Sequence, residues 1–198
     1  MYPGSIRNLI ECLKNLHGIA EKTAERMAYS IVGFDKDRLS EFIDSLSCIK
    51  DNIKKCPVCN NITDMDMCYI CKDTNRSDDT IFVVEKSKDI VLFEKMGTYN
   101  GKYHVLNGLI SPMDGINPDD INLDSLIDRV KNNNVKEVIV VLKPSIEGET
   151  TMQYIKKILS KYNVKVSKIP IGIPMGADIE YIDTMTLELA FENRNDIA

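Results

Sequence analysis

Four of the six cysteines lie in one short segment as two Cys-x2-Cys pairs, Cys56 with Cys59 and Cys68 with Cys71. The two-residue gap lets both sulfurs of a pair converge on one metal ion. The segment 54–76 is too short to bury a core of its own, so we expect a metal to hold it together. Four thiolates are a ligand set of structural zinc and leave no open position for water. We therefore predict a four-cysteine zinc module, with four unrelated thiols or two redox-active pairs as alternatives.

The composition is that of an ordinary globular protein, because 43% of the 198 residues are hydrophobic and 28% are charged. No run approaches the roughly 18–20 apolar residues of a membrane helix, and the N-terminus lacks the pattern of a secretory signal. We expect a cytoplasmic protein with no membrane partner. The net charge of −5 argues against a chain that is basic all over, although a local basic patch is enough to bind nucleic acid.

Residues 1–53 carry three helical patterns, at about 5–16, 21–33 and 37–50. Gly18 permits a tight turn between the first two, as in a helix-hairpin-helix. The backbone N–H groups that open the second helix can then hold a phosphate. Lys22 and Arg26 share a face of that helix and suit two contacts along one DNA backbone. The spacing alone favours a plain helix pair with solvated charges, and a DNA-binding region is the functional alternative.

Strands and helices alternate in residues 77–172. The expected strands are 81–84, 102–106, 138–142 and 164–169, and the expected helices are 88–96, 123–130 and 148–162. This rhythm predicts an α/β fold with a mostly parallel, Rossmann-like sheet covered on both faces. A C-terminal segment, 173–198, carries one more helix at 178–191. His104 alternates with apolar neighbours in a strand, so we expect it to pack rather than to catalyse.

Acidic side chains follow two of the predicted strands, at the sheet edge where α/β folds bind ligands. Glu85 ends the first strand, and Glu147 and Glu149 lie just beyond the third. Three carboxylates can hold Mg²⁺ for phosphoryl transfer. The residues that directly follow the third strand include Lys143 and Ser145, which are not normal Mg²⁺ ligands. A solvated acidic turn is the alternative interpretation.

In this order, the motifs resemble the RecR family of bacterial recombination mediators. Four stretches carry the resemblance and together span nearly the whole chain: the hairpin Leu16–Ala28; the cysteine pairs Cys56-Pro57-Val58-Cys59 and Cys68-Tyr69-Ile70-Cys71; Tyr103–Asp119; and Glu147-Gly148-Glu149 with Gly172–Tyr181. The resemblance implies a helix-hairpin-helix at 1–53, a zinc module at 54–76, a Toprim domain at 77–172 and a C-terminal segment at 173–198.

The resemblance also implies a function. Members of this family form ring-like tetramers that encircle or clamp single-stranded and duplex DNA. With RecO, and in some settings RecF, they help RecA to replace single-strand-binding protein on gapped DNA. They are not known as enzymes, and their place is in the cytoplasm at the nucleoid.

This chain departs from the family pattern at a few positions. His17 stands where the family usually has proline, and Ala20 where it usually has glycine. Lys143 and Ser145 occupy the positions where catalytic Toprim proteins carry an Asp-x-Asp pair. An ammonium and a hydroxyl in place of two carboxylates remove most of the charge that would gather Mg²⁺. That replacement argues against topoisomerase-like or primase-like catalysis.

We therefore predict a non-catalytic DNA-binding mediator with structural Zn²⁺ and no catalytic residues. Lys22 and Arg26 are the candidate phosphate contacts, and Glu147 and Glu149 the candidate contacts for RecO or RecF. The alternative is a Mg²⁺-dependent Toprim nuclease or primase with Glu85 as general acid/base. A third hypothesis is a zinc-bearing interaction protein that does not touch DNA.

Overall fold

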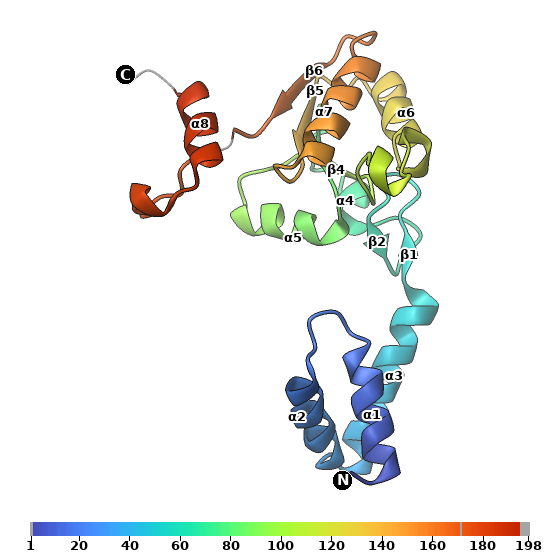
Figure 1. The fold of residues 1–198 in the computed structure, drawn as a ribbon. Helices are drawn as coiled ribbons and strands as arrows, with labels where there is room; N and C mark the ends of the chain where they lie inside the picture. Colours follow the sequence, from blue (N-terminus) through green and yellow to red (C-terminus); the bar gives the residue numbers. More distant parts are fainter. Residues whose placement is uncertain (1, 171, 195–198) are drawn as a thin grey trace. The chain divides into compact units, whose positions relative to one another are not determined.

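The computed structural model of the chain describes residues 2–170 and 172–194. The chain forms two compact units, Met1–Ile53 and Lys54–Ala198, shown as one ribbon in Figure 1. The finer division at residues 76 and 172 stays a prediction. Among the described helices, none is both long enough and apolar enough to cross a lipid bilayer.

The first unit consists of three helices: α1 (Gly4–Lys14), α2 (Glu21–Val32) and α3 (Lys36–Asn52). Its small core joins Ile10 of α1 to Ala24 and Ala28 of α2. The alanines present no long side chain, so α1 and α2 can lie close together. Asp35 starts α3 by accepting a hydrogen bond from the Arg38 N–H at 2.8 Å.

Helix α3 differs from the other two helices because none of its residues is buried. Its apolar side chains recur every three or four residues and are 36–62% exposed: Leu39, Phe42, Ile43, Leu46 and Ile49. The sequence pattern is that of a helix with a buried face. Within its own unit, Met1–Ile53, the described residues leave that face exposed, so α3 carries an apolar stripe.

The second unit is built on a four-stranded parallel sheet. Its strands are β3 (Thr80–Val84), β4 (Lys102–Val105), β5 (Glu137–Val141) and β6 (Lys165–Lys168), in the order β4-β3-β5-β6. Val83 lies opposite His104 on one side and Val140 on the other. Helices α5 (Ser87–Met96), α6 (Asp124–Asn132) and α7 (Ile146–Leu159) lie between successive strands in the chain. The predicted parallel α/β fold is confirmed.

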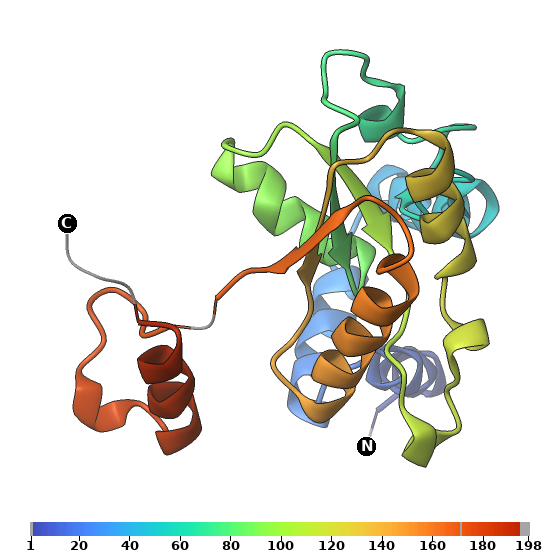
Figure 2. The ribbon, with the colours of Figure 1, turned by 90° about the horizontal axis from the view of Figure 1, so that it is seen from above.

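The two faces of the sheet carry separate hydrophobic clusters. On one face, β3 and β5 pack against α6 and α7 through a core that includes Ile81, Val83, Leu126, Val138, Val140, Ile155 and Leu159. On the other face, Phe82 and Val84 pack with Tyr103 and Val105 of β4 and with Ile90 of α5. Figure 2 shows α5 and α7 on opposite sides of the strands. Successive residues of β3 therefore alternate between the two clusters.

A short cysteine-rich module precedes the sheet. It consists of the antiparallel pair β1 (Lys54–Lys55) and β2 (Ile62–Thr63), followed by the single-turn helix α4 (Tyr69–Lys72). Its Cys56, Cys59, Cys68 and Ile70 are buried and belong to the same cluster as Tyr103. The module thus shares a core with the sheet instead of forming its own.

The C-terminal segment differs from the prediction of one helix over 178–191. A 3-10 turn spans Ile179–Tyr181, and the helix α8 covers only Thr184–Glu192. Asp183 lies between them and accepts hydrogen bonds from the N–H and hydroxyl of Thr186, at 2.9 and 2.7 Å. A side chain that satisfies the first turn in this way starts a new helix, so the predicted continuous helix is wrong.

Candidate functional site

The four predicted metal ligands lie together. Cys56 and Cys59 come from the turn between β1 and β2, while Cys68 precedes α4 and Cys71 lies within it. Their Sγ atoms are all within 4.8 Å of one another, and those of Cys59 and Cys68 are 3.5 Å apart. Asn60 makes the turn possible by adopting a left-handed conformation (φ 62°), which asparagine tolerates better than most residues.

This cluster fits a tetrahedral zinc ion. Zn–S bonds of about 2.3 Å place the sulfurs of such a site roughly 3.8 Å apart, which agrees with the spread of the four Sγ atoms. All four donors are sulfur, which zinc accepts and Mg²⁺ does not. Three of the cysteines are buried and Cys71 is half-buried. The residues present therefore suit structural Zn²⁺, held by four thiolates.

The thiols interact strongly with one another. Hydrogen bonding to Cys59 lowers the pKa of Cys68 to about 2, and the same contact raises the pKa of Cys59. Burial adds to the rise at Cys59. Four sulfurs at this spacing favour a shared cation, because a cation relieves the cost of ionising all of them.

The cysteine module covers the edge of the sheet. Strand β4 is the outermost strand, and its Val105 N–H donates to the Cys59 carbonyl at 2.8 Å. The Asn60 side-chain amide donates to the Val105 carbonyl at 3.0 Å. These two bonds satisfy backbone groups that would otherwise offer an edge for unwanted pairing. The metal site and the sheet are therefore built as one structure.

The hairpin between α1 and α2 forms despite its two departures from the family pattern. Gly18 has a φ of +83°, which favours glycine. Ala20 has φ −83° and ψ 164°, an extended conformation open to any residue. No side chain caps α2, whose first bonds run from the Thr23 and Ala24 N–H groups to the Ala20 carbonyl. The turn needs one glycine only, and Ala20 meets its backbone requirement.

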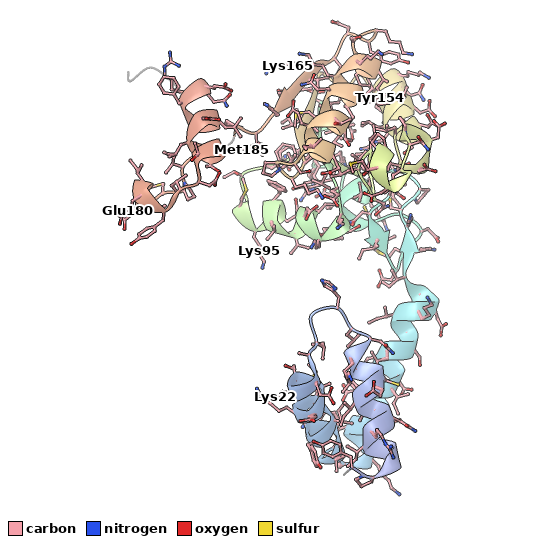
Figure 3. The ribbon with its side chains drawn as sticks, viewed as in Figure 1. Lys22, Lys95, Tyr154, Lys165, Glu180 and Met185 are labelled. Carbon is pink, nitrogen blue, oxygen red and sulfur yellow. The ribbon has the colours of Figure 1, made fainter. Side chains whose placement is uncertain are left out.

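The two predicted phosphate contacts are available to solvent. Lys22 and Arg26 are both exposed, and no carboxylate of residues 2–170 or 172–194 lies within ion-pair distance of either. Figure 3 shows Lys22 pointing away from α2. The nearby acid Glu21 instead pairs with Lys14 at 3.2 Å, and the contact with Glu25 raises the pKa of Tyr2.

The three carboxylates predicted to share Mg²⁺ each have a partner of their own. The Glu85 Oε1 atom lies 3.1 Å from the Lys86 Nζ. Glu147 accepts from the Ser145 hydroxyl at 2.7 Å, which lowers the pKa of that carboxyl. Glu149 accepts from Gln153 at 2.7 Å and lies 3.8 Å from the Lys168 Nζ. In the described part of the chain, only the four cysteines form a group of metal-ligating side chains this close.

The start of α7 lies beside a cavity of about 910 Å³. The cavity is mostly apolar, and its lining includes Ile146, Glu149, Met152, Lys168 and Met185. Ile146 is 83% exposed, so an apolar side chain and a carboxylate stand together at this surface. Ser145 caps α7 by accepting from the Gly148 N–H at 3.2 Å. Its hydroxyl is therefore already engaged within the helix start.

Matches to known proteins cover nearly the whole chain. The RecR helix-hairpin-helix model matches residues 6–49, and the RecR four-cysteine zinc finger model matches 53–73. The Toprim domain model matches 79–170, and the RecR C-terminal model matches 172–195. The chain is 44% identical over 196 residues to "Recombination protein RecR" of Natranaerobius thermophilus, covering 99% of this chain and 98% of that protein. It belongs to the RecR family.

A second RecR relative supports the assignment. "Recombination protein RecR" of Lactobacillus johnsonii is 45% identical over 197 residues, which is 99% of each chain. The RecR zinc finger match includes all four cysteines, and the RecR hairpin match includes Lys22 and Arg26. The resemblance predicted from the motifs and the predicted zinc module are confirmed. The roles of Lys22, Arg26, Glu147 and Glu149 stay predictions.

Two residues of this RecR-family chain, Gly148 and Lys102, have structural roles that the sequence analysis did not identify. Gly148 is buried, and a Cβ there would lie 2.1 Å from the Lys143 carbonyl oxygen, so α7 can approach the end of β5 only at a glycine. Lys102 is a lysine with 4% exposure on an edge strand. Gly148 belongs to the Glu-Gly-Glu motif of the sequence analysis, but the motif does not show that a glycine is needed there for packing. Nothing in the sequence indicates that Lys102 is buried.

Proposed function

We propose that this chain is a non-catalytic DNA-binding mediator of recombinational repair that acts in the cytoplasm at the nucleoid. The observation that carries the proposal is the surface of α2, where Lys22 and Arg26 are exposed and have no carboxylate partner among the described residues. The uncapped first turn of the same helix adds N–H groups that suit a phosphate. The names of the two relatives, both recombination proteins, support the same role.

Contacts of this kind do not depend on base sequence. They neutralise backbone phosphates, so affinity falls as salt rises, with a log–log slope of about −0.9 for each neutralised phosphate on duplex DNA. One hairpin supplies few such contacts. Useful affinity for single-stranded or duplex DNA then needs several subunits acting at once.

Fluorescence anisotropy with labelled single-stranded and duplex oligonucleotides tests this role. Lys22→Ala combined with Arg26→Ala should remove most of the binding at modest salt and make the remaining binding less salt-dependent. The matched control is Lys36→Ala with Lys50→Ala, which removes the same charge from exposed positions of α3 in the same unit. If both double variants lose affinity equally, general charge rather than the hairpin binds DNA. Unchanged affinity in the first variant would reject the assignment.

We also infer that the Toprim domain is not catalytic. The support is the chemistry at the strand ends, where Lys143 and the N-capping Ser145 follow β5 and Glu85 pairs with Lys86. Incubating the protein with labelled DNA and Mg²⁺ tests the nuclease alternative, and adding nucleotides tests the primase alternative. A product that forms with the wild type and is lost in Glu85→Gln would overturn the inference.

A homo-oligomer, which we propose is a ring-like tetramer, fits the uncovered apolar stripe of α3. Leu46 and Ile49 on that stripe are 56% and 62% exposed. Contiguous apolar surface of this kind favours burial against another protein surface. Light scattering after size-exclusion chromatography, with and without DNA, measures the mass. A monomer under both conditions would reject the tetramer.

For the partners RecO and RecF we propose the surface at the start of α7. Glu149 and the exposed Ile146 line the same cavity, and Glu147 lies between them in sequence. Through these partners the chain would help RecA to replace single-strand-binding protein on gapped DNA. Glu147→Lys with Glu149→Lys should abolish capture of purified RecO or RecF. Lys156→Glu with Lys157→Glu, in the last turn of the same helix, is the control. Capture that survives the first change would remove this surface from the proposal.

A further inference from the structure

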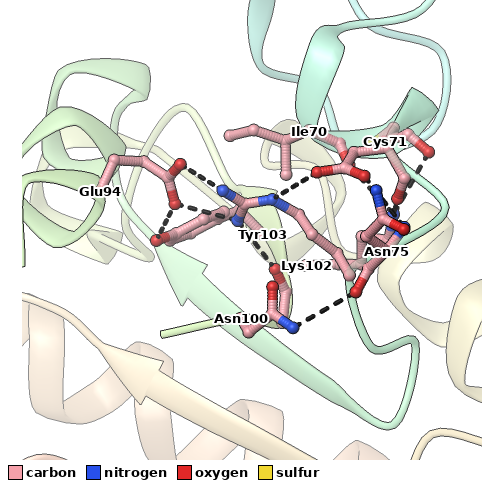
Figure 4. A network of polar contacts seen from close by, with 10 residues as sticks. Ile70, Cys71, Asn75, Glu94, Asn100, Lys102 and Tyr103 are labelled. Carbon is pink, nitrogen blue, oxygen red and sulfur yellow. Dashed lines mark hydrogen bonds and ion pairs between the residues drawn. The ribbon is translucent and has the colours of Figure 1, made fainter. Parts of the chain in front are cut away.

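Lys102 is a buried ammonium beside the cysteine cluster. It lies on β4 with 4% of its surface exposed. Its Nζ donates to the carbonyls of Ile70 at 3.0 Å, Cys71 at 3.4 Å and Asp73 at 2.6 Å. Figure 4 shows Lys102 with Ile70 and Cys71 in a network of polar contacts. The three N–H donors of the ammonium can thus all be used by the backbone around one zinc ligand.

The charge of Lys102 is not balanced by a carboxylate. Within the described residues, no Asp or Glu oxygen lies within ion-pair distance of its Nζ. Carbonyl dipoles satisfy its hydrogen bonds, but a buried cation is costly unless a negative charge lies near it. Four thiolates around one divalent zinc ion carry a net double negative charge. A metal-loaded site would supply negative charge beside Lys102, whose Nζ contacts the backbone carbonyl of the ligand Cys71 at 3.4 Å.

The hydrogen bonds that Lys102 donates also fix the position of one predicted zinc ligand, Cys71. Cys71 lies in α4, a helix of only four residues, and it is the least buried of the four cysteines. Carbonyls near the end of a helix attract a cation. Lys102 binds the carbonyls of Cys71, of the residue before it and of Asp73 in this turn, so it holds the backbone that carries the Cys71 sulfur.

A second set of charged contacts holds the segment after Cys71 against the sheet and α5. Asp73 pairs with the Arg76 Nε at 3.6 Å, and Arg76 also makes a two-pronged ion pair with Glu94 of α5. The Tyr103 hydroxyl, from the residue after Lys102, donates to Glu94 at 2.8 Å. The segment that follows Cys71 is therefore tied to both β4 and α5 (Figure 4).

We propose that Lys102 is a positioning residue of the zinc site, which raises metal affinity by holding the Cys71 turn and by offsetting the negative charge of the metal–thiolate cluster. This role is independent of DNA binding. Outer partners of metal ligands typically change metal affinity by about 10–100-fold. Lys102→Met keeps an unbranched side chain that is one atom shorter and removes the charge and the donors, so it should weaken Zn²⁺ binding by roughly that factor.

The measurement is Zn²⁺ competition between the full chain and a chromophoric chelator, with melting temperatures of zinc-loaded and chelator-treated protein as a second readout. The gain in melting temperature on adding zinc should be smaller in Lys102→Met than in the wild type. A merely structural role would lower both melting temperatures equally and leave that gain unchanged. The control, Lys54→Met, removes an exposed lysine of the same module that pairs with Asp66 at 2.6 Å.

Zn²⁺ affinity in Lys102→Met within about twofold of the wild type, or an equal loss in Lys54→Met, would overturn the proposal. Lys102→Gln keeps N–H donors without the charge. It provides the test of Zn²⁺ affinity if Lys102→Met does not fold. Weaker Zn²⁺ binding in Lys102→Gln supports the proposal, and binding equal to the wild type overturns it. Recovery of affinity in Lys102→Arg, relative to Lys102→Gln, supports the part assigned to charge.

Discussion

The cysteine module and the N-terminal helical unit are both small, yet the module buries its key side chains against the sheet while the helical unit leaves apolar side chains exposed. In the module, the cysteines and Ile70 pack into a cluster with the sheet, and Lys102 completes the polar contacts of α4. In the helical unit, the buried core consists of Ile10, Ala24 and Ala28, while the apolar face of α3 is exposed. The module is stabilised by its metal and its neighbour in the chain. The helical unit keeps an apolar face exposed, and such a face favours burial against another protein surface.

The largest effect should come from removing a metal ligand. Cys59→Ser leaves three thiolates and an open position, and the module is too short to fold without its metal. We expect bound zinc to fall well below one ion per chain and the second unit to unfold several degrees lower. Zinc content by atomic emission and calorimetric melting measure both changes. Cys12→Ser, at an exposed lone cysteine of the helical unit, should change neither. Full zinc occupancy in Cys59→Ser would contradict the four-thiolate site.

The opposite behaviour is expected of the α3 stripe. Leu46→Asp puts a charge on an exposed apolar position, so the stability of the single chain should change by no more than about 0.5 kcal/mol. Its mass in solution should fall, because a charge in the centre of an apolar contact between subunits is costly. Light scattering and thermal melting separate the two outcomes. Ser47→Asp, one residue further along α3, is the control for added charge. Unchanged mass for Leu46→Asp would mean that this stripe does not join subunits.

Packing inside the second unit can be tested at a single glycine. Gly148→Ala adds a Cβ that would meet the Lys143 carbonyl oxygen at 2.1 Å, so α7 must move away from the end of β5. We expect a loss of about 1–3 kcal/mol in the free energy of unfolding, measured by urea titration. Gly172→Ala adds the same methyl group where nothing lies within 4 Å and should have little effect. Equal stability of the two variants would show that the loop at Lys143 yields freely.

Local patterns predicted the parts of this molecule whose cause is local. The Cys-x2-Cys spacing brings sulfurs together whatever surrounds them, so the metal cluster was predictable. The alternation of strands and helices predicted the parallel sheet, and His104 lies buried in β4 as expected of a packing residue. The helix start at Asp183 was not predicted, because a capping residue within an apolar helical pattern cannot be told from an ordinary polar position of the helix.

Features that depend on distant contacts could not be predicted. Lys102 is 31 positions from Cys71 along the chain, and no periodicity links a strand lysine to carbonyls of another module. The α3 residues Phe42 and Leu46 have the spacing of core positions, and the sequence does not tell whether their cover is in the same chain or in another. The three carboxylates near the strand ends looked like one site because parallel strands end at one edge. Each instead takes a partner close in sequence or on β6.

The buried histidine of the second unit, His104, should make the stability of that unit depend on pH. Burial lowers the pKa of His104 from 6.5 to about 3, and the nearby Arg129 charge adds to the decrease. The geometry agrees: Nε2 lies 2.7 Å from the Asn122 carbonyl, to which it donates, and Nδ1 lies 3.4 Å from an Arg129 N–H donor. The ring is therefore held neutral, with its proton on Nε2.

Between pH 6.5 and 3, the unfolded chain takes up a proton at His104 that the folded chain does not. The free energy of unfolding should then decrease as the pH falls through this window, by up to about 1.4 kcal/mol per pH unit from this residue. His104→Gln removes the titrating group, so its stability should depend less steeply on pH between about 6.5 and 5 than that of the wild type. Urea titrations at matched zinc occupancy measure the slopes. Equal slopes for the wild type and His104→Gln would mean that β4 opens enough to let His104 take up its proton in the folded state.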